Sequence, residues 1–217
     1  MAASICIEAV QALGGFAADK VALERGGREL FRVLDFRAVA GDAISVEGPN
    51  GVGKTSLLRL LAGFLSQASG TITLTTSDGV TIADAEERSA FIGWLGHQDG
   101  VKPQLTPIET LTFYSQYYGV TGDIDAALAE VGLSRARDLP AQYLSAGQKK
   151  RVALARLKLS GRPLWLLDEP LASLDAEGKM LAARFIADHC KTGGIAIAAT
   201  HEPLGIECTK LMLGDGQ

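Results

Sequence analysis

A glycine-rich stretch near the start of the chain has the residue types and spacing that bind phosphate. It reads Gly48-Pro49-Asn50-Gly51-Val52-Gly53-Lys54-Thr55-Ser56 and fits the pattern G-x-x-x-x-G-K-[ST]. The glycines let backbone N–H groups turn toward phosphate oxygens, Lys54 is placed to reach the β- and γ-phosphates, and the Thr55 hydroxyl can hold Mg²⁺. An alternating stretch precedes the motif and good helix formers follow it, so it lies between a strand and a helix. This context favours a nucleotide-binding loop over a chance glycine-rich turn.

Two adjacent acids follow a short hydrophobic run. Residues 164–167 are all apolar, which is typical of a strand buried on both faces of a parallel sheet, and Asp168-Glu169 comes directly after them. Ligands bind at this carboxyl edge of such sheets. There, one acid can hold Mg²⁺ through water and the other can orient or deprotonate an attacking water. The alternative interpretation is an exposed acidic turn. It is less favoured here, because a hydrophobic strand followed by Asp-Glu is the expected partner of a phosphate loop.

Two more polar side chains follow expected strands. Gln98 comes after the apolar stretch 91–96, and His201 comes after residues 194–200. His201 would share the layer of Asp168 and Glu169, where it could contact a γ-phosphate, although a lone histidine is usually structural. For His189-Cys190, a metal site is less favoured than a place in the last turn of a helix, where positive charge is stabilising.

A capping box predicts a second helix start with free backbone N–H groups. Ser145 is followed three residues later by Gln148, so a helix should begin there and run through Leu157. Its N-terminus is a possible second anion site, or simply a well-capped helix. The run Lys149-Lys150-Arg151 is expected to form a solvated helix face rather than a nucleic-acid patch.

The remaining pattern places these motifs on a mixed sheet and a helical insertion. The helix after the phosphate loop is expected to run to about Leu65, and Asp78-Gly79 predicts a hairpin turn. Thr106 begins a capping box, with a helix to Tyr118 and a second helix from Asp123. Expected strands cover residues 5–10, 21–24, 30–36, 71–75, 80–82, 91–96, 164–167 and 194–200. A helical lobe from about residue 99 to 159 is therefore inserted into the core.

Composition narrows the class of protein. The chain has 217 residues, 47% of them hydrophobic, with a net charge of -4, which is ample for one packed domain and argues against nucleic-acid binding. Three scattered cysteines suggest a reducing compartment rather than a disulfide framework. The N-terminus lacks a basic region typical of a signal peptide, and no apolar run is long enough to span a bilayer. We therefore expect a protein that is soluble by itself and is held at any membrane by something else.

Taken together, the motifs resemble those of ATP-binding subunits of ABC transporters over nearly the whole chain. They occur in the family's order: the phosphate loop, Gln98, LSAGQ at residues 144–148, LLDEP at residues 166–170, SLD at residues 173–175, and His201. The stretches GHQDGVKPQLTPIETLTFY, LSAGQKKRVALARLKLSGRPLWLLDEP and ATHEPL are similar to the cytochrome c maturation (haem exporter) branch. In that branch, too, alanine takes the place of the first glycine of the signature.

The resemblance implies an α/β fold: a P-loop NTPase core with an antiparallel β part and an inserted helical lobe. One ABC domain would span residues 1–217, with a core lobe at 1–98 and 160–217 and a helical lobe at 99–159. ATP and Mg²⁺ would be the cofactors. Two copies would pair head to tail, and permease subunits would hold the pair on the cytoplasmic face of a bacterial inner membrane.

Residue roles carry over from the same resemblance. Glu169 would be the general base, assisted by His201 and Gln98. Thr55 and Gln98 would contact Mg²⁺ directly, and Asp168 would do so through water. Gln98 would also sense the membrane partner, and Asp175 would communicate between the copies. Nucleotide contacts would come from Gly48, Pro49, Asn50, Gly51, Val52, Gly53, Lys54, Thr55, Ser56, Ser145, Gly147, Gln148 and Asp175.

One departure and several alternatives stay open. Many ABC ATPases stack adenine on an aromatic residue, whereas the equivalent position here holds Arg25, whose guanidinium can also stack on a base. The preference for ATP over GTP is therefore open. The chain could serve another ABC importer or exporter, a soluble nucleic-acid-clamping ABC protein, or a scaffold without turnover. The sequence lacks the basic surface and coiled-coil insertion of the nucleic-acid class.

Overall fold

The structure, a computed structural model, describes residues 12–214. The strand expected at residues 5–10 lies outside the described residues. The strands are β1 (Leu13–Arg25), β2 (Arg28–Val39), β3 (Ala43–Glu47), β4 (Ser69–Thr76), β5 (Thr81–Ile82), β6 (Ile92–Leu95), β7 (Leu164–Asp168), β8 (Ile195–Ala199) and β9 (Thr209–Met212). The helices are α1 (Lys54–Leu61), α2 (Ala85–Ser89), α3 (Pro107–Tyr118), α4 (Ile124–Glu130), α5 (Ala146–Leu159) and α6 (Ala176–Lys191), with 3₁₀ turns η1 (Ser134–Ala136) and η2 (Ala141–Tyr143).

The strands form two sheets, so the expectation of one mixed sheet was wrong. An antiparallel sheet has the order β2-β1-β4-β5, and a parallel sheet has the order β6-β7-β8-β3-β9. The two sheets differ in how their strands are buried. In β1 buried residues alternate with more exposed ones, as expected for a sheet covered on one face, whereas every residue of β7 and β8 is buried. The α/β fold class with an antiparallel β part is confirmed.

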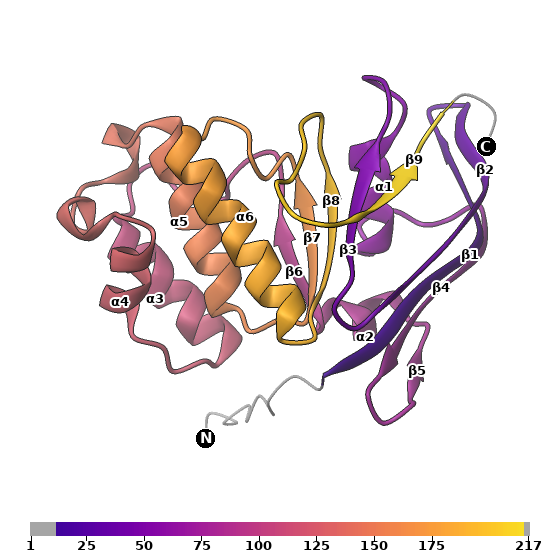
Figure 1. Cartoon of the computed structure of the whole chain (residues 1–217), viewed down its shortest axis with the longest axis horizontal. Coiled ribbons are helices and arrows are strands. Elements are labelled where there is room, and N and C mark those ends of the chain that lie inside the picture. The colour runs from indigo at the N-terminus through magenta and orange to yellow at the C-terminus, as the bar shows by residue number, and fades with distance from the viewer. Residues whose placement is uncertain (1–11, 215–217) are drawn as a thin grey trace.

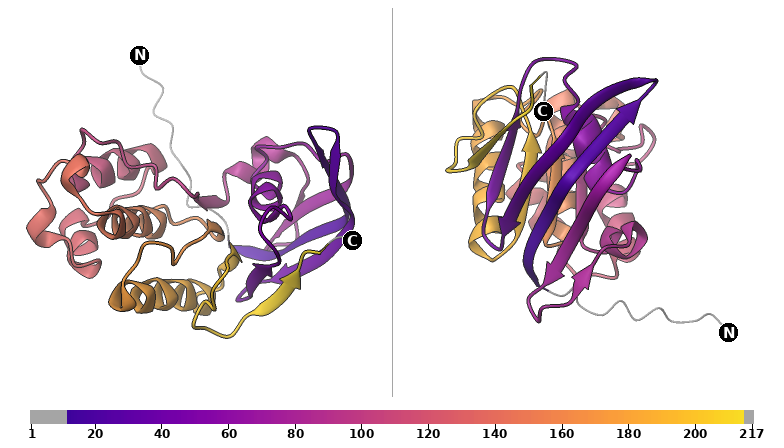
Figure 2. Two further views of the ribbon diagram at one scale, coloured as in Figure 1. Left: turned by 90° about the horizontal axis from the view of Figure 1, so that it is seen from above. Right: turned by 90° about the vertical axis from the view of Figure 1, so that its right-hand side faces the viewer.

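The parallel sheet separates two hydrophobic cores because successive side chains of a strand point to opposite faces. On β7, Leu164 and Leu166 pack with α1 and the antiparallel sheet. Trp165 and Leu167 pack on the other face with α3 to α6. Figures 1 and 2 show this arrangement, with the antiparallel sheet at one end of the molecule and helices α3 to α6 at the other. The polar motifs predicted from the sequence lie at the carboxyl edge of this sheet, between the two cores.

Local signals predicted the helices well. Thr106 and Glu109 form the expected capping box at the start of α3, and Gly119 ends that helix with a left-handed backbone at φ 66°. Helix α1 ends at Leu61 rather than Leu65, since Gly63 turns the chain away with φ 79°. Helix α2 and strand β9 were not anticipated.

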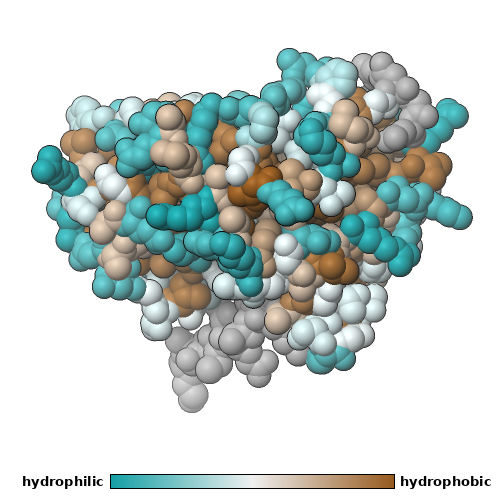
Figure 3. Space-filling view, in the orientation of Figure 1, coloured by the Kyte–Doolittle hydropathy of each residue, from teal (hydrophilic) through white to brown (hydrophobic). Residues whose placement is uncertain are grey.

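No helix within residues 12–214 is both long and apolar enough to cross a membrane. On the face shown in Figure 3, hydrophobic residues are scattered among hydrophilic ones. Large exposed apolar side chains include Phe64, Phe113 and Tyr117.

Candidate nucleotide-binding site

The polar motifs converge at the carboxyl edge of the parallel sheet. Strand β3 leads into the phosphate loop, β7 ends at Asp168, and β8 is followed by Thr200 and His201. Strand β6 pairs in parallel with β7, with Leu95 opposite Leu167, so Gln98 follows at the same edge. Segments that lie far apart in the sequence are thus brought to the place where α/β sheets bind ligands.

The phosphate loop is built on backbone that only glycine accommodates. Gly48 has φ 149°, and a Cβ there would lie 2.3 Å from the carbonyl oxygen of Leu213. Gly53 begins α1 in the left-handed region at φ 111°. The loop therefore curls tightly before α1, whose N-terminal N–H groups face the space above the loop and favour an anion.

Lys54 lies inside this loop. Its ammonium donates hydrogen bonds to the carbonyl oxygens of Gly48, at 2.8 Å, and Pro49, at 3.1 Å. The residue is only 7% exposed, and burial lowers the pKa of its amine, although the carboxylates of Glu169 and Asp168 oppose that shift. A phosphate group beside Lys54 would supply the counter-charge that this desolvated ammonium needs.

Thr55 and Asp168 form the second part of the site. The Thr55 hydroxyl donates a 3.0 Å hydrogen bond to Oδ1 of Asp168, which is 3% exposed. A hydroxyl and a carboxylate are hard oxygen ligands of the kind that Mg²⁺ prefers, and Mg²⁺ usually joins one or two carboxylates to substrate phosphates. The residues present therefore fit this ion, with Gln98 as a further oxygen donor at the same edge.

Glu169 and His201 form the third part. Glu169 has a left-handed backbone at φ 49°, uncommon for a residue with a side chain, and its N–H donates to the carbonyl oxygen of Ala199 at 2.9 Å. The His201 Nε2 lies 3.4 Å from Oε1 of Glu169. Strained backbone held in place by a neighbouring strand is frequent at active sites. Here it turns the Glu169 side chain toward His201.

A cavity of about 550 Å³ opens over the phosphate loop. Its described lining has three parts: the loop and the start of α1, the tip region of the β1–β2 hairpin, and His201. The residues are Arg25, Leu30, Asn50, Gly51, Gly53, Lys54, Thr55, Ser56 and His201. Leu30, which sequence reasoning missed, packs beside Gly53. It carries no motif signal, because only the folded hairpin brings it there.

The predicted second anion site lies apart from this cavity. Ser145 caps α5, accepting a hydrogen bond from Gln148 N–H at 3.2 Å, while Oε1 of Gln148 accepts from Ser145 N–H at 2.9 Å. Ser145 is exposed and does not line the cavity over Lys54. Within one chain, the two helix N-termini therefore do not share a ligand.

The start of α5 packs against the turn from Ser173 to Asp175. A Cβ on Gly147 would lie 2.8 Å from the carbonyl oxygen of Ser173, so packing within the chain also requires glycine there. Asp175 caps α6, and its pKa is lowered by a hydrogen bond from Gly178 N–H and by the Arg151 guanidinium 2.8 Å away. Asp175 thus joins the start of α6 to α5.

Within the run Lys149-Lys150-Arg151, the expectation of a solvated helix face was wrong for Lys150 and Arg151, whose side chains are 4% and 14% exposed. Lys150 is 3% exposed, and its ammonium lies 2.8 Å from Oδ1 of Asp99, the residue after Gln98. The Arg151 side chain reaches Asp175. The sequence pattern marked these residues as charged but could not show that Lys150 and Arg151 pair with Asp99 and Asp175.

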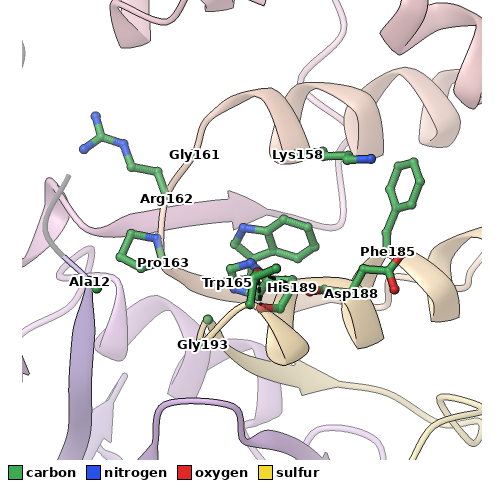
Figure 4. Close-up of a pocket in the computed structure, with 12 residues that line it drawn as sticks. Ala12, Lys158, Gly161, Arg162, Pro163, Trp165, Phe185, Asp188, His189 and Gly193 are labelled. Atoms are coloured by element: carbon green, nitrogen blue, oxygen red, sulfur yellow. Dashed lines mark hydrogen bonds between the residues drawn. The ribbon is translucent and has the colours of Figure 1, made fainter. Parts of the chain in front are cut away.

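A second cavity, of about 340 Å³, lies at the opposite edge of the parallel sheet (Figure 4). The rings of Trp165 and His189 stack there at 3.9 Å, with Nε2 of His189 lying 3.3 Å from the Ile195 carbonyl oxygen. Burial lowers the pKa of His189 to about 4, so it is neutral at pH 7. The place in the last turn of α6 is confirmed, and the neutral ring adds no positive charge to that helix end.

Comparison with known proteins agrees with this geometry. Residues 31–172 match the family model described as ABC transporter. The chain is 47% identical to the cytochrome c biogenesis ATP-binding export protein CcmA of Rhodopseudomonas palustris (strain HaA2), over 88% of this chain and 93% of that protein. It is 46% identical to the protein of the same name from Bradyrhizobium diazoefficiens, over 90% of this chain and 96% of that protein.

A solved structure of an ATP-binding subunit of an ABC transporter superposes with a TM-score of 0.80 at 19% identity, covering 93% of this chain and 86% of that one. At that identity the likeness supports the fold alone. With the family model matched across the phosphate loop, the signature and Asp168-Glu169, the chain belongs to the ABC transporter family as an ABC-type ATP-binding, ATP-hydrolysing subunit.

Proposed function

We propose that this chain hydrolyses Mg²⁺-bound ATP to drive a haem-exporter-type membrane complex in cytochrome c biogenesis. The observation that carries the chemistry is the convergence of Lys54, the Thr55–Asp168 pair and the Glu169–His201 pair at one sheet edge. The biological role is supported by relatives of that name that are 42–50% identical over most of the chain.

Each residue has a role that follows from its place. Lys54 and the loop N–H groups bind the β- and γ-phosphates, and Glu169 accepts a proton from the attacking water. His201, beside Glu169, holds the γ-phosphate and orients that carboxylate. Thr55, Asp168 and Gln98 would hold Mg²⁺, which supplies charge neutralisation for the phosphoryl group. Asn50 and Ser56 would supply the remaining contacts from the loop to the nucleotide.

We further propose that two copies pair head to tail, with ATP between Lys54 of one and Ser145 of the other. Ser145 is exposed at a helix N-terminus whose first turn contains no acidic residue. A triphosphate needs its charge met on several sides, and the second helix N-terminus would provide this. Gly147, Gln148 and Asp175 would lie along the interface, and Asp175 would link it to α6.

We propose that the chain acts as one domain, with the lobes at 1–98 with 160–217 and at 99–159, and binds its membrane subunits on α3. Phe113 and Tyr117 are 54% and 66% exposed, and their rings lie parallel, 6.4 Å apart. Exposed aromatic pairs are frequent anchors of protein interfaces. Such docking would place the chain on the cytoplasmic face of the inner membrane.

The experiment is affinity purification of the Glu169→Gln chain from detergent-solubilised membranes with Mg-ATP, followed by mass spectrometry. Cytochrome c maturation membrane subunits are the expected partners. Recovery of an unrelated permease would keep the ATPase chemistry and replace the biological role with another ABC importer or exporter. A Lys54→Ala chain, which should not bind ATP, controls for nucleotide-independent capture.

A further inference from the structure

Helix α5 touches two segments of the candidate site at once. Near its N-terminus Gly147 and Arg151 meet the turn from Ser173 to Asp175. Further along, two buried basic side chains, Lys150 and Arg156, reach the segment that carries Gln98. The mechanism above uses Ser145 and Gln98 but gives no part to these two cations.

Lys150 makes an ion pair that is largely removed from water. Its side chain is 4% exposed and that of Asp99 is 19% exposed, with 2.8 Å between Nζ and Oδ1. Charges buried to this degree are tolerated only when they are paired, because each alone would lose its hydration without compensation. The pair therefore fixes the distance between α5 and the residue next to Gln98.

Arg156 holds the same segment from a second point. Its Nη2 donates to the carbonyl oxygen of Trp94 at 3.2 Å, and its guanidinium lies over the ring of Tyr114 on α3 at 4.8 Å. A Cβ on Gly100 would lie 2.5 Å from Nη1 of Arg156. Residues 94–100 are thus held against α5 on both sides of Gln98, while Gln98 itself is exposed.

We propose that Lys150 is a positioning residue, which through Asp99 sets the place of Gln98 relative to Ser145. Because both contacts are made by one rigid helix, a shift of Gln98 toward the nucleotide moves α5 and with it the Ser145 end offered to the second copy. Lys150 would thereby couple occupation of one site to pairing of the two copies. This inference rests on the proposed function, since it takes Gln98 as an Mg²⁺ ligand.

The test compares ATP affinity of the full-length chain with Mg²⁺ and with EDTA, by calorimetry. In Lys150→Met, affinity in EDTA should be unchanged, while the gain produced by Mg²⁺ should fall by about 10- to 100-fold, the usual effect of removing a side chain that orients a metal ligand. Lys150→Arg should restore the gain. Lys158→Met is the matched control, since Lys158 lies on the same helix but pairs with Glu130.

The double variant Asp99→Asn with Lys150→Met guards against misfolding, because it leaves no unpaired buried charge. It should lose the Mg²⁺ gain just as Lys150→Met does. A lower melting temperature with an unchanged Mg²⁺ gain in both variants would overturn the proposal and reduce the pair to packing. Failure of the wild-type chain to bind ATP at all would instead overturn the proposed function.

Pairing gives a second readout. In the Glu169→Gln background, ATP should convert the chain to a dimer by size-exclusion chromatography with light scattering. Adding Lys150→Met should lower the dimer fraction at saturating ATP, whereas adding Lys158→Met should not. Equal dimer fractions in the two would contradict the coupling. A Glu169→Gln parent that binds ATP but stays monomeric would contradict the paired state itself, and the Mg²⁺ comparison would then decide the role of Lys150.

Discussion

The Thr55 hydroxyl lies 3.0 Å from Oδ1 of Asp168, although 113 residues separate them in the sequence. Thr55 lies at the start of α1, which follows β3, and Asp168 lies at the end of β7. In the sheet, β8 lies between β7 and β3. The sheet order therefore presents two oxygen ligands as one unit. Their hydrogen bond holds the Asp168 carboxylate in place before any ligand arrives.

Removal of the Thr55 hydroxyl should weaken the effect of Mg²⁺ specifically. In Thr55→Ala, ATP affinity in EDTA should stay near that of the wild type, because Lys54 and the loop N–H groups are untouched. With Mg²⁺, affinity should fall by about tenfold or more. Thr55→Ser keeps the hydroxyl and should retain the Mg²⁺ effect in the same titration. An equal loss in Thr55→Ala with and without Mg²⁺ would argue that Thr55 acts only in folding the loop.

Arg25 should hold the nucleobase. It lines the phosphate-loop cavity, and no Phe, Tyr or Trp occurs among the described residues of that lining. A guanidinium stacked on a base makes a contact that tolerates different bases. Arg25→Ala should weaken ATP and GTP binding by about 1–3 kcal/mol each and leave inorganic tripolyphosphate unchanged.

The control for that series is Arg25→Lys, which keeps the charge and loses the flat guanidinium. It should resemble Arg25→Ala in binding ATP. Full recovery of ATP affinity in Arg25→Lys would show that Arg25 acts by charge on a phosphate, and a change in tripolyphosphate binding in Arg25→Ala would support that reading.

Local chemistry explains which parts of the structure the sequence predicted. The capping boxes at Thr106 and Ser145 depend on residues three apart, so the starts of α3 and α5 follow directly from the sequence. The phosphate loop and the acids after β7 are equally local. Their meeting at one edge follows from parallel strands buried on both faces, which the run 164–167 also indicated.

Contacts between distant segments explain what was missed. Lys150 lies in a charged run, and only packing of α5 against residues 94–100 buries it. His189 was expected in the last turn of a helix, but its burial against Trp165 could not be predicted from the sequence. The separation into two sheets depends on burial of whole faces, which strand-by-strand patterns do not give. The left-handed Glu169 has no sequence signal, since glycine is the usual residue there.

His189 should make the chain sensitive to acid. Its pKa is lowered from 6.5 to about 4, so the unfolded chain binds more protons between these values. The free energy of unfolding is therefore greatest above pH 6.5 and falls by roughly 3 kcal/mol as the pH drops to about 4, below which this contribution stays lost.

Urea denaturation across that pH range measures the effect. His189→Phe keeps a ring against Trp165. Its unfolding free energy should fall by roughly 3 kcal/mol less than that of the wild type over the same pH range. His97→Gln, at an exposed histidine, should keep the wild-type slope. Equal slopes in His189→Phe and the wild type would mean that folding leaves the pKa of His189 unchanged.

The α3 aromatic pair should be needed for membrane partners and not for nucleotide. Phe113→Ser with Tyr117→Ser should remove an interface anchor costing about 2 kcal/mol or more. Co-purification of the membrane subunits should be lost while ATP affinity is unchanged. Val80→Ser, which removes a similarly exposed apolar side chain at 54% exposure on the β4–β5 hairpin, should co-purify normally. Normal recovery of the membrane subunits with the α3 variant would move the docking surface elsewhere.

The most direct test of the central claim is single-turnover ATP hydrolysis by the complex carrying Glu169→Gln, with ATP binding measured in parallel. The amide introduced by this substitution is isosteric with the carboxylate but cannot accept the proton of water. The account predicts unchanged ATP affinity and hydrolysis slower by about 10²- to 10⁴-fold, the usual contribution of a general base. Unchanged hydrolysis in Glu169→Gln would contradict the assignment of Glu169 as the base.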